Sequence, residues 1–141
     1  MVKPYSQTFT IEGRNFINAG KASTEIKSVL TQLGVAPAAI RRVAIATFEA
    51  EMNVVMYALR ATLTFEVTPE AVRVVIEDSG PGIPDIALAM QEGFSTATNE
   101  MREMGFGAGM GLPNIKKNAD NFAITSVVGQ GTQLHVQVNQ A

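Results

Sequence analysis

The sequence contains no cysteine and only one histidine, His135, among its 141 residues. Without cysteine the chain can form neither a disulfide framework nor a thiolate metal site, and it has no thiol nucleophile. A mechanism of the Ser-His-Asp kind would have to use His135. A chain without disulfides suits a reducing compartment, so we expect a cytoplasmic location.

Long apolar runs are also missing. No stretch approaches the roughly 18 uninterrupted apolar residues of a membrane helix, and residues 1–14 lack the apolar centre of a signal peptide. We therefore expect no association with a membrane. The 11 basic and 13 acidic side chains give a net charge of −2. This balance argues against nucleic acid as a partner, because such proteins carry a basic footprint.

The composition suits one compact domain over residues 1–141. Apolar residues make up 46% of the chain and charged residues 17%, which disfavours disorder. A domain of this length can bury about 68% of the surface that its unfolded chain exposes. We find no internal repeat and no linker in the sequence.

The charges are unevenly distributed along the chain. Residues 1–48 carry six basic and two acidic side chains, which leaves an excess of negative charge for the remainder. A solvated helix surface would explain the basic excess. The alternative is a docking face for an acidic protein partner.

A strand and a helix are predicted at the amino end. Polar and apolar residues alternate over residues 5–11, which indicates a strand. A helix capped by Asn18 or Ser23 should follow and extend to about Leu33. Gly34 is typical of the residue that ends a helix.

A longer helix is predicted over residues 37–59, because Pro37 favours the first turn. Its core face is expected to be one apolar stripe formed by Ala44, Phe48, Met52, Val55 and Leu59. Two polar residues, Glu49 and Asn53, lie at the edge of this stripe.

The rest of the chain predicts a largely antiparallel sheet. Two β-branched runs flank a Thr-Pro-Glu turn and should form a hairpin. His135 falls on the last predicted strand, where a core or edge-strand position is expected. The order β-α-α-β-β-loop-α-β-β predicts an α+β fold with helices on one face of the sheet. The predicted strands are 61–67, 71–77, 122–128 and 132–138, and the helices are 85–91 and 110–119.

Glu49 and Asn53 are candidates for chemistry. They are four residues apart, so their side chains lie on one side of the helix about a turn from each other. A carboxylate in such a place can act as general base for a hydroxyl or water, and an amide oxygen can bind Mg²⁺. A solvated helix surface is the alternative, because this spacing is common.

A second candidate is the segment 77–83, which reads EDSGPGI and follows an apolar strand. Gly80 and Gly82 permit a tight turn close to a flat ligand. Asp78 can accept a hydrogen bond from an exocyclic amine. The alternative is an ordinary turn in which Asp78 bonds its own backbone.

Glycine alternates with other residues at positions 105, 107, 109 and 111. The sequence does not fit a P-loop, because the nearest candidate, 13–22, has six residues between its glycines and Ala22 in place of the hydroxyl. The alternating glycines do not follow a strand directly, which excludes a dinucleotide fingerprint. We expect their amides to turn toward phosphate groups, beside the positive end of the next helix. A flexible surface loop is the alternative.

In this order, the three segments resemble the GHKL ATPases, a superfamily named for gyrase, Hsp90, histidine kinases and MutL. The resemblance covers roughly residues 37–138 and implies a Bergerat fold. This fold is an α/β sandwich of the histidine-kinase-like type that holds ATP between the long helix and a mobile lid. The matching motifs are Glu49-x-x-x-Asn53, Asp78-x-Gly80-x-Gly82-Ile83, Gly107-x-Gly109-x-Gly111-Leu112 and Gly131-Thr132.

The resemblance also implies a role for each matching residue. Asp78 should contact the adenine amino group, with Thr132 beside it through water. Asn53 should hold Mg²⁺, and Glu49 should act as the base. The residues implied to bind ATP are Asn53, Asp78, Gly80, Gly82, Ile83, Gly105, Gly107, Gly109, Met110, Gly111, Leu112 and Thr132.

The lid implied by the resemblance is segment 94–106. It contains one basic residue, Arg102. Stabilisation of the γ-phosphate therefore falls to Arg102, to Lys116 or to a partner. A solvated lid charge is the alternative for Arg102.

Within the superfamily, the chain is similar to small bacterial serine/threonine kinases of the anti-sigma-factor and stressosome switch type. Gyrase, Hsp90 and MutL proteins need further domains, and His135 does not lie on a dimerisation helix. The residues after Asn53 read VVMY, which favours the stressosome type. The resemblance implies transfer of the γ-phosphoryl group of Mg-ATP to a serine or threonine of a STAS-domain protein. A sigma factor or a phosphatase is a further partner in some members.

Two other functions stay open on the sequence. One is a nucleotide-gated binding module without catalysis, such as an anti-sigma factor, and the other is simple ATP hydrolysis. Homodimerisation is common in the family that the chain resembles. The open edge of the first strand offers a physical route to a dimer.

Overall fold

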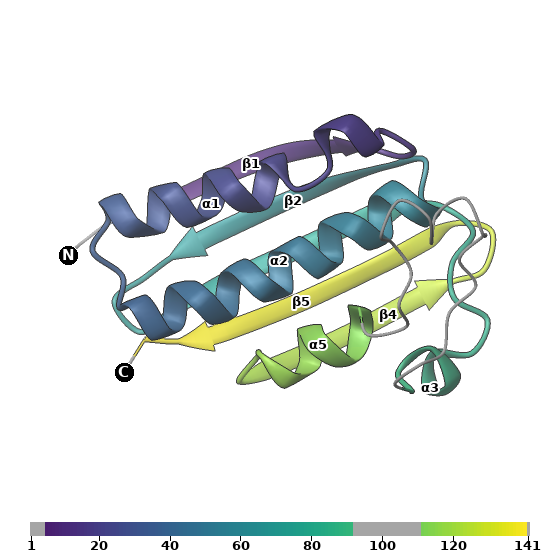
Figure 1. The fold of residues 1–141 in the computed structure, drawn as a ribbon. Helices are drawn as coiled ribbons and strands as arrows, with labels where there is room; N and C mark the ends of the chain where they lie inside the picture. Colours follow the sequence, from purple (N-terminus) through teal and green to yellow (C-terminus); the bar gives the residue numbers. More distant parts are fainter. Residues whose placement is uncertain (1–4, 92–110, 141) are drawn as a thin grey trace.

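The computed structural model describes residues 5–91 and 111–140 (Figure 1). The predicted order of helices and strands is confirmed in this part of the chain, with one short 3-10 helix added before α1. The elements are β1 (Tyr5–Glu12), η1 (Phe16–Asn18), α1 (Lys21–Gln32), α2 (Pro37–Tyr57), β2 (Arg60–Val67), β3 (Ala71–Ser79), α3 (Ile86–Ala89), α5 (Gly111–Lys117), β4 (Asn121–Val127) and β5 (Gly131–Asn139).

The five strands form one sheet in the order β1-β2-β3-β5-β4. Every neighbouring pair is antiparallel. The predicted hairpin joins β2 to β3, and the Thr68 amide donates to the Ala71 carbonyl at 2.9 Å to close its turn. Both edges of the sheet, β1 and β4, come from chain segments far apart in sequence.

Helices α1, α2 and α5 cover one face of the sheet, with α2 between the other two (Figure 1). The strands show the alternation of a sheet that is covered on one side. In β2, for example, Leu63 and Phe65 are buried under the helices and Thr62 is exposed. The α+β fold with helices on one face of an antiparallel sheet is therefore confirmed.

The predicted cap of the first helix is wrong. Helix α1 begins at Lys21 after Gly20, which has a left-handed backbone (φ 92°) and no side chain to cap the helix. Asn18 belongs to η1, and Ser23 lies inside the first turn, where its hydroxyl donates to the Gly20 carbonyl at 3.0 Å. The cap comes instead from Glu51 on α2, as described below.

The predicted apolar stripe on the long helix is also partly wrong. Phe48 is 44% exposed, and Leu59 lies beyond the end of α2 and is 78% exposed. Helix α2 has a neighbour on each flank, so burial extends around most of its circumference. Small residues such as Ala46 and Ala50 are buried in the core. Since charged residues interrupt α2, neither it nor another described helix is apolar enough over a sufficient length to span a bilayer.

His135 occupies neither of its predicted positions. Its strand, β5, lies between β3 and β4, so it is not an edge strand. Its side chain is exposed, whereas those of Leu134 and Val136 on either side are buried. The alternation of the strand places His135 on the open face of the sheet.

Candidate functional site

The two motifs around Asp78 and Thr132 meet in the fold. The Thr132 amide donates to Oδ1 of Asp78 at 3.1 Å. The Thr132 hydroxyl lies 2.9 Å from that of Ser126, which also accepts from the Ile83 amide at 2.7 Å. One hydrogen-bonded network therefore joins segment 78–83 to the turn between β4 and β5.

Close packing of these two turns explains their glycines. Gly82 has φ +75°, and a Cβ there would lie 2.5 Å from the Val127 carbonyl oxygen. A Cβ on Gly131, at φ +149°, would overlap the carbonyl oxygen of Asp78. Gly80 approaches the end of α2, since a Cβ there would lie 3.1 Å from the Ala58 Cα. Contacts within the protein, rather than room for a ligand, thus account for the small residues.

Asp78 is half-buried at the end of β3. Burial raises the pKa of its carboxyl group, and the hydrogen bond from the Thr132 amide lowers that pKa by a smaller amount. Within the described segments no hydrogen bond engages Oδ2 of Asp78. The side chain thus offers a partly desolvated acceptor held in place by the neighbouring strand.

A second group of predicted residues gathers where α2 meets α5. A Cβ on Gly111, the first residue of α5, would lie only 3.1 Å from Oδ1 of Asn53. Glu49 lies one turn earlier on the same side of α2, and both side chains are partly exposed. Leu112 is buried in the contact between the two helices. In the described part of the chain, neither Glu49 nor Asn53 has a hydrogen-bond or ion-pair partner for its side chain.

The last turns of α2 connect the two groups. Asn53 is five residues before Ala58, a distance of about 7.5 Å along a helix, and Ala58 contacts Gly80. The structure therefore brings nine predicted residues to one end of the molecule: Glu49, Asn53, Asp78, Gly80, Gly82, Ile83, Gly111, Leu112 and Thr132. Six other predictions lie outside the described residues: Arg102, the lid at 94–106, and the candidate phosphate-binding residues Gly105, Gly107, Gly109 and Met110.

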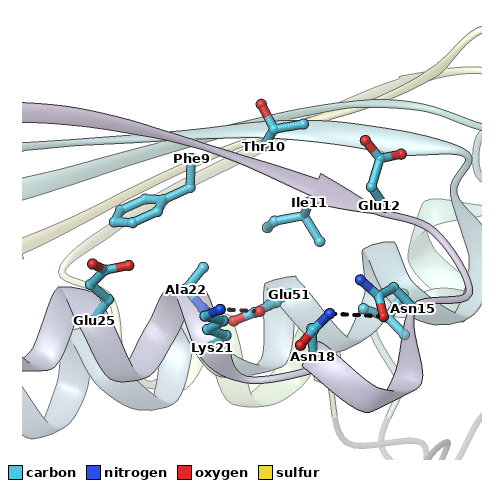
Figure 2. Close-up of a pocket in the computed structure, with 11 residues that line it drawn as sticks. Phe9, Thr10, Ile11, Glu12, Asn15, Asn18, Lys21, Ala22, Glu25 and Glu51 are labelled. Atoms are coloured by element: carbon cyan, nitrogen blue, oxygen red, sulfur yellow. Dashed lines mark hydrogen bonds between the residues drawn. The ribbon is translucent and has the colours of Figure 1, made fainter.

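Sequence reasoning missed Glu51, which is only 3% exposed. Its Oε2 accepts from the amides of Gly20 at 3.0 Å and Ala22 at 3.2 Å, and its Oε1 accepts from that of Ser23 at 2.9 Å. Figure 2 shows this carboxylate at the start of α1. We call this contact the Glu51 clasp. A carboxylate is favourable there because the amino end of a helix is positive.

Ser126 was missed as well. The last two predicted strands, 122–128 and 132–138, contained a signal for it, because Ser126 pairs with Thr132 when these strands are neighbours. Glu51 gave a weaker signal. It is two residues from Glu49, which places the two carboxylates on opposite flanks of one helix.

A hollow of about 230 Å³ lies between β1 and the start of α1. Phe9 and Ile11 point into it from the strand (Figure 2). The Glu51 clasp borders this hollow. None of the predicted nucleotide-binding residues that the structure describes does, so the hollow is separate from the described part of the candidate site.

The free energy of unfolding is expected to depend on pH through Asp78. The native pKa of this carboxyl group is raised above its ordinary value of 3.8, so the folded chain holds the proton more tightly than the unfolded chain. Its contribution to stability is therefore full at low pH and is lost as the pH rises through the raised pKa. Urea unfolding from about pH 3 to about pH 7 should show Asp78→Asn gaining stability relative to the wild type as the pH rises. A difference that is constant over this range would contradict the raised pKa.

Comparison with known proteins agrees with this geometry. A family model described as the histidine kinase-like ATPase domain matches residues 17–138. The chain is also similar to the serine/threonine-protein kinase RsbT of Bacillus subtilis (strain 168). The two are 33% identical over 112 residues, which cover 77% of this chain and 78% of that protein. The family match includes both groups of site residues.

Proposed function

The chain belongs to the histidine kinase-like ATPase family and resembles its small switch kinases, and on this basis we propose that it is an ATP-dependent serine/threonine kinase. Acting as a cytoplasmic regulatory switch, it phosphorylates a STAS-domain partner. The observation that supports this function best concerns the carboxyl end of α2. Glu49 and Asn53 lie on its last turns and Asp78 of β3 lies nearby, and among the residues that the structure describes each of the three has a side-chain oxygen without a hydrogen-bond partner.

Asp78 binds the adenine in this proposal. Its Oδ1 is held by the Thr132 amide, and Oδ2 is left to accept from the amino group of the base. Thr132 and Ser126 provide neighbouring hydroxyl groups that can hold a water molecule against the same edge. The hydrogen-bonded strand ends keep these groups in place before the nucleotide arrives.

Asn53 fits a role as a ligand of Mg²⁺. Its amide oxygen is a hard donor of the type that this ion prefers, and Gly111 leaves the space next to that oxygen free of a side chain. When bound, Mg²⁺ neutralises charge on the phosphate oxygens. The remaining predicted phosphate contacts, from Gly105, Gly107, Gly109 and Met110, stay predictions from the sequence.

Glu49 is the base in the proposed reaction. The partner's hydroxyl oxygen forms a bond to the γ-phosphorus of ATP as the bond from that phosphorus to the β–γ bridging oxygen breaks. ADP leaves, and the hydroxyl proton passes to the Glu49 carboxylate. Positioning and charge neutralisation supply most of the acceleration in such transfers.

The direct test incubates the purified chain with Mg²⁺, γ-labelled ATP and each of a panel of purified STAS-domain proteins. Kinase activity predicts label on a serine or threonine of one of them, located by mass spectrometry. Nucleotide-dependent binding without label would favour a binding module instead. Release of phosphate without a partner would favour simple ATP hydrolysis.

Asp78→Asn should weaken ATP binding roughly hundredfold. The new amide group would place an N–H donor against the amino group of the adenine, which is itself a donor. The charge-assisted hydrogen bond to the adenine would also be lost. Titration calorimetry with ATP and ADP measures the effect. Asp85→Asn is the matched control, because Asp85 caps α3 and asparagine caps a helix equally well. Equal ATP affinity in Asp78→Asn and the wild type would remove Asp78 from the site.

A further inference from the structure

Two apolar side chains are exposed on the helix layer. Ile17 on η1 is 95% exposed, and Phe48 on α2 is 44% exposed. Phe48 lies beside the segment that carries Ile17, because a Cβ on Gly20, three residues after Ile17, would be 3.4 Å from the Phe48 ring. We call residues 14–21 the η1 segment. Met52 and Met56 of α2 are buried against Phe16 and Ala19 of this segment. The η1 segment therefore lies along the outer side of α2.

Basic side chains surround these two residues. Arg14 and Lys21 are exposed at either end of the η1 segment. Arg41 is exposed on α2 two turns before Phe48, on the same side of that helix. We call Arg14, Ile17, Lys21, Arg41 and Phe48 the η1 patch.

The cations of the η1 patch differ from the other arginines that the structure describes. Arg42, Arg60 and Arg73 each form an ion pair with a carboxylate. Among residues 5–91 and 111–140, no carboxylate lies within ion-pair distance of Arg14, Lys21 or Arg41. The exposed acid of α1, Glu25, lies one turn after Lys21 and faces Phe9 of β1 (Figure 2). The cations of the patch are thus held in no ion pair with the described residues and are available to a partner.

We propose that the η1 patch docks the acidic face of the protein that receives the phosphoryl group. Apolar anchors within a polar rim are the usual composition of a protein interface. Phe48 precedes Glu49 in the sequence, so a partner seated on Phe48 lies next to the proposed base. That this partner is the kinase substrate rests on the proposed function. Docking itself is a binding event, and it can be measured without phosphoryl transfer.

The same features favour a protein over other anionic partners. The chain has a net charge of −2, whereas nucleic-acid binding draws its affinity from many phosphate contacts. Interfacial membrane binding needs a broad apolar helix face, and the η1 patch offers two apolar side chains. A complementary surface would present carboxylates around a small apolar recess.

The test measures binding of the full chain to each of the purified STAS-domain proteins by calorimetry, without nucleotide and at two salt concentrations. Phe48→Ala and Lys21→Glu should each weaken binding at least about tenfold. High salt should weaken the binding of the wild type, and it should weaken the binding of Lys21→Glu by a smaller factor. The matched controls are Leu33→Ala, which removes a half-exposed apolar side chain at the end of α1, and Arg73→Glu on the open face of the sheet. Both controls should bind like the wild type, and ATP affinity should be unchanged in all four variants.

Each outcome separates docking from catalysis. If Phe48→Ala and Lys21→Glu both bind the partner as tightly as the wild type does, the proposed docking surface is wrong, even if that partner is phosphorylated. Binding that the variants lose, without any transfer by the wild type, would support docking and overturn the kinase. Failure of every STAS-domain protein to bind would overturn the proposed occupant. So would patch-dependent binding to phosphatidylserine vesicles or to a DNA duplex in place of a protein.

Discussion

Glu49→Gln is expected to slow phosphoryl transfer about a thousandfold, within the range usual for loss of a general base. Glutamine fills the same space, but its amide cannot take the proton from the attacking hydroxyl. The ATP dissociation constant should stay within about twofold of the wild-type value, because the base contacts the acceptor rather than the nucleotide. Single-turnover transfer to the labelled partner and calorimetry with ATP measure the two quantities separately.

Glu25→Gln is the control for this experiment, since it makes the same chemical change on an exposed position of α1. It should transfer at the wild-type rate. A Glu49→Gln variant that also transfers at the wild-type rate would remove Glu49 from the mechanism. Loss of ATP binding in that variant would instead place Glu49 against the nucleotide.

Glu51→Ala is expected to lower the free energy of unfolding by about 3 kcal/mol. The substitution leaves the amides of Gly20, Ala22 and Ser23 without the acceptor that they now share. It also removes a negative charge from the positive end of α1. Urea unfolding followed by circular dichroism measures the loss.

Glu51→Gln should lose less, because one carbonyl oxygen can still accept from part of the group. Glu49→Gln is the matched control on the opposite flank of α2 and should change stability by less than about 0.5 kcal/mol. If Glu51→Ala unfolds at the same urea concentration as the wild type, the Glu51 clasp contributes nothing to stability.

The strands were predictable because one face of the sheet is buried and the other is solvated. This arrangement imposes a period of two on the sequence, and β2 shows it plainly, with Ala61, Leu63 and Phe65 buried. The cap of α1 was not predictable in the same way. Local signals pointed to Asn18 or Ser23, but the acceptor is supplied by Glu51 from 28 to 31 residues away.

The core face of α2 was misjudged for a related reason. Hydrophobic periodicity predicts one buried side for a helix at the surface of a domain. Helix α2 instead has α1 on one flank and α5 on the other, and these helices bury further sides of it. Burial therefore includes Thr47 and Glu51, and Phe48 is left on the outer side. Large apolar residues were assigned to the core by type, and their neighbours in space were unknown.

The candidate site was partly predictable. Spacing alone placed Glu49 and Asn53 on one side of a helix, and the structure agrees. The contact between Asn53 and Gly111 and the network through Ser126 depend on how distant segments pack. Their functional roles come from the family motifs and stay predictions.

Because α2 carries Glu49 and Glu51 on opposite flanks, the Glu51 clasp resists rotation of that helix about its axis. Any turn of α2 that swings Glu49 and Asn53 must pull the Glu51 oxygens away from three amides. The contact of Glu51 with α1 therefore fixes the direction in which Glu49 and Asn53 point on the opposite flank of α2. Helix α1 thus restrains the rotation of α2 from a place apart from the predicted nucleotide-binding residues that lie within 5–91 and 111–140.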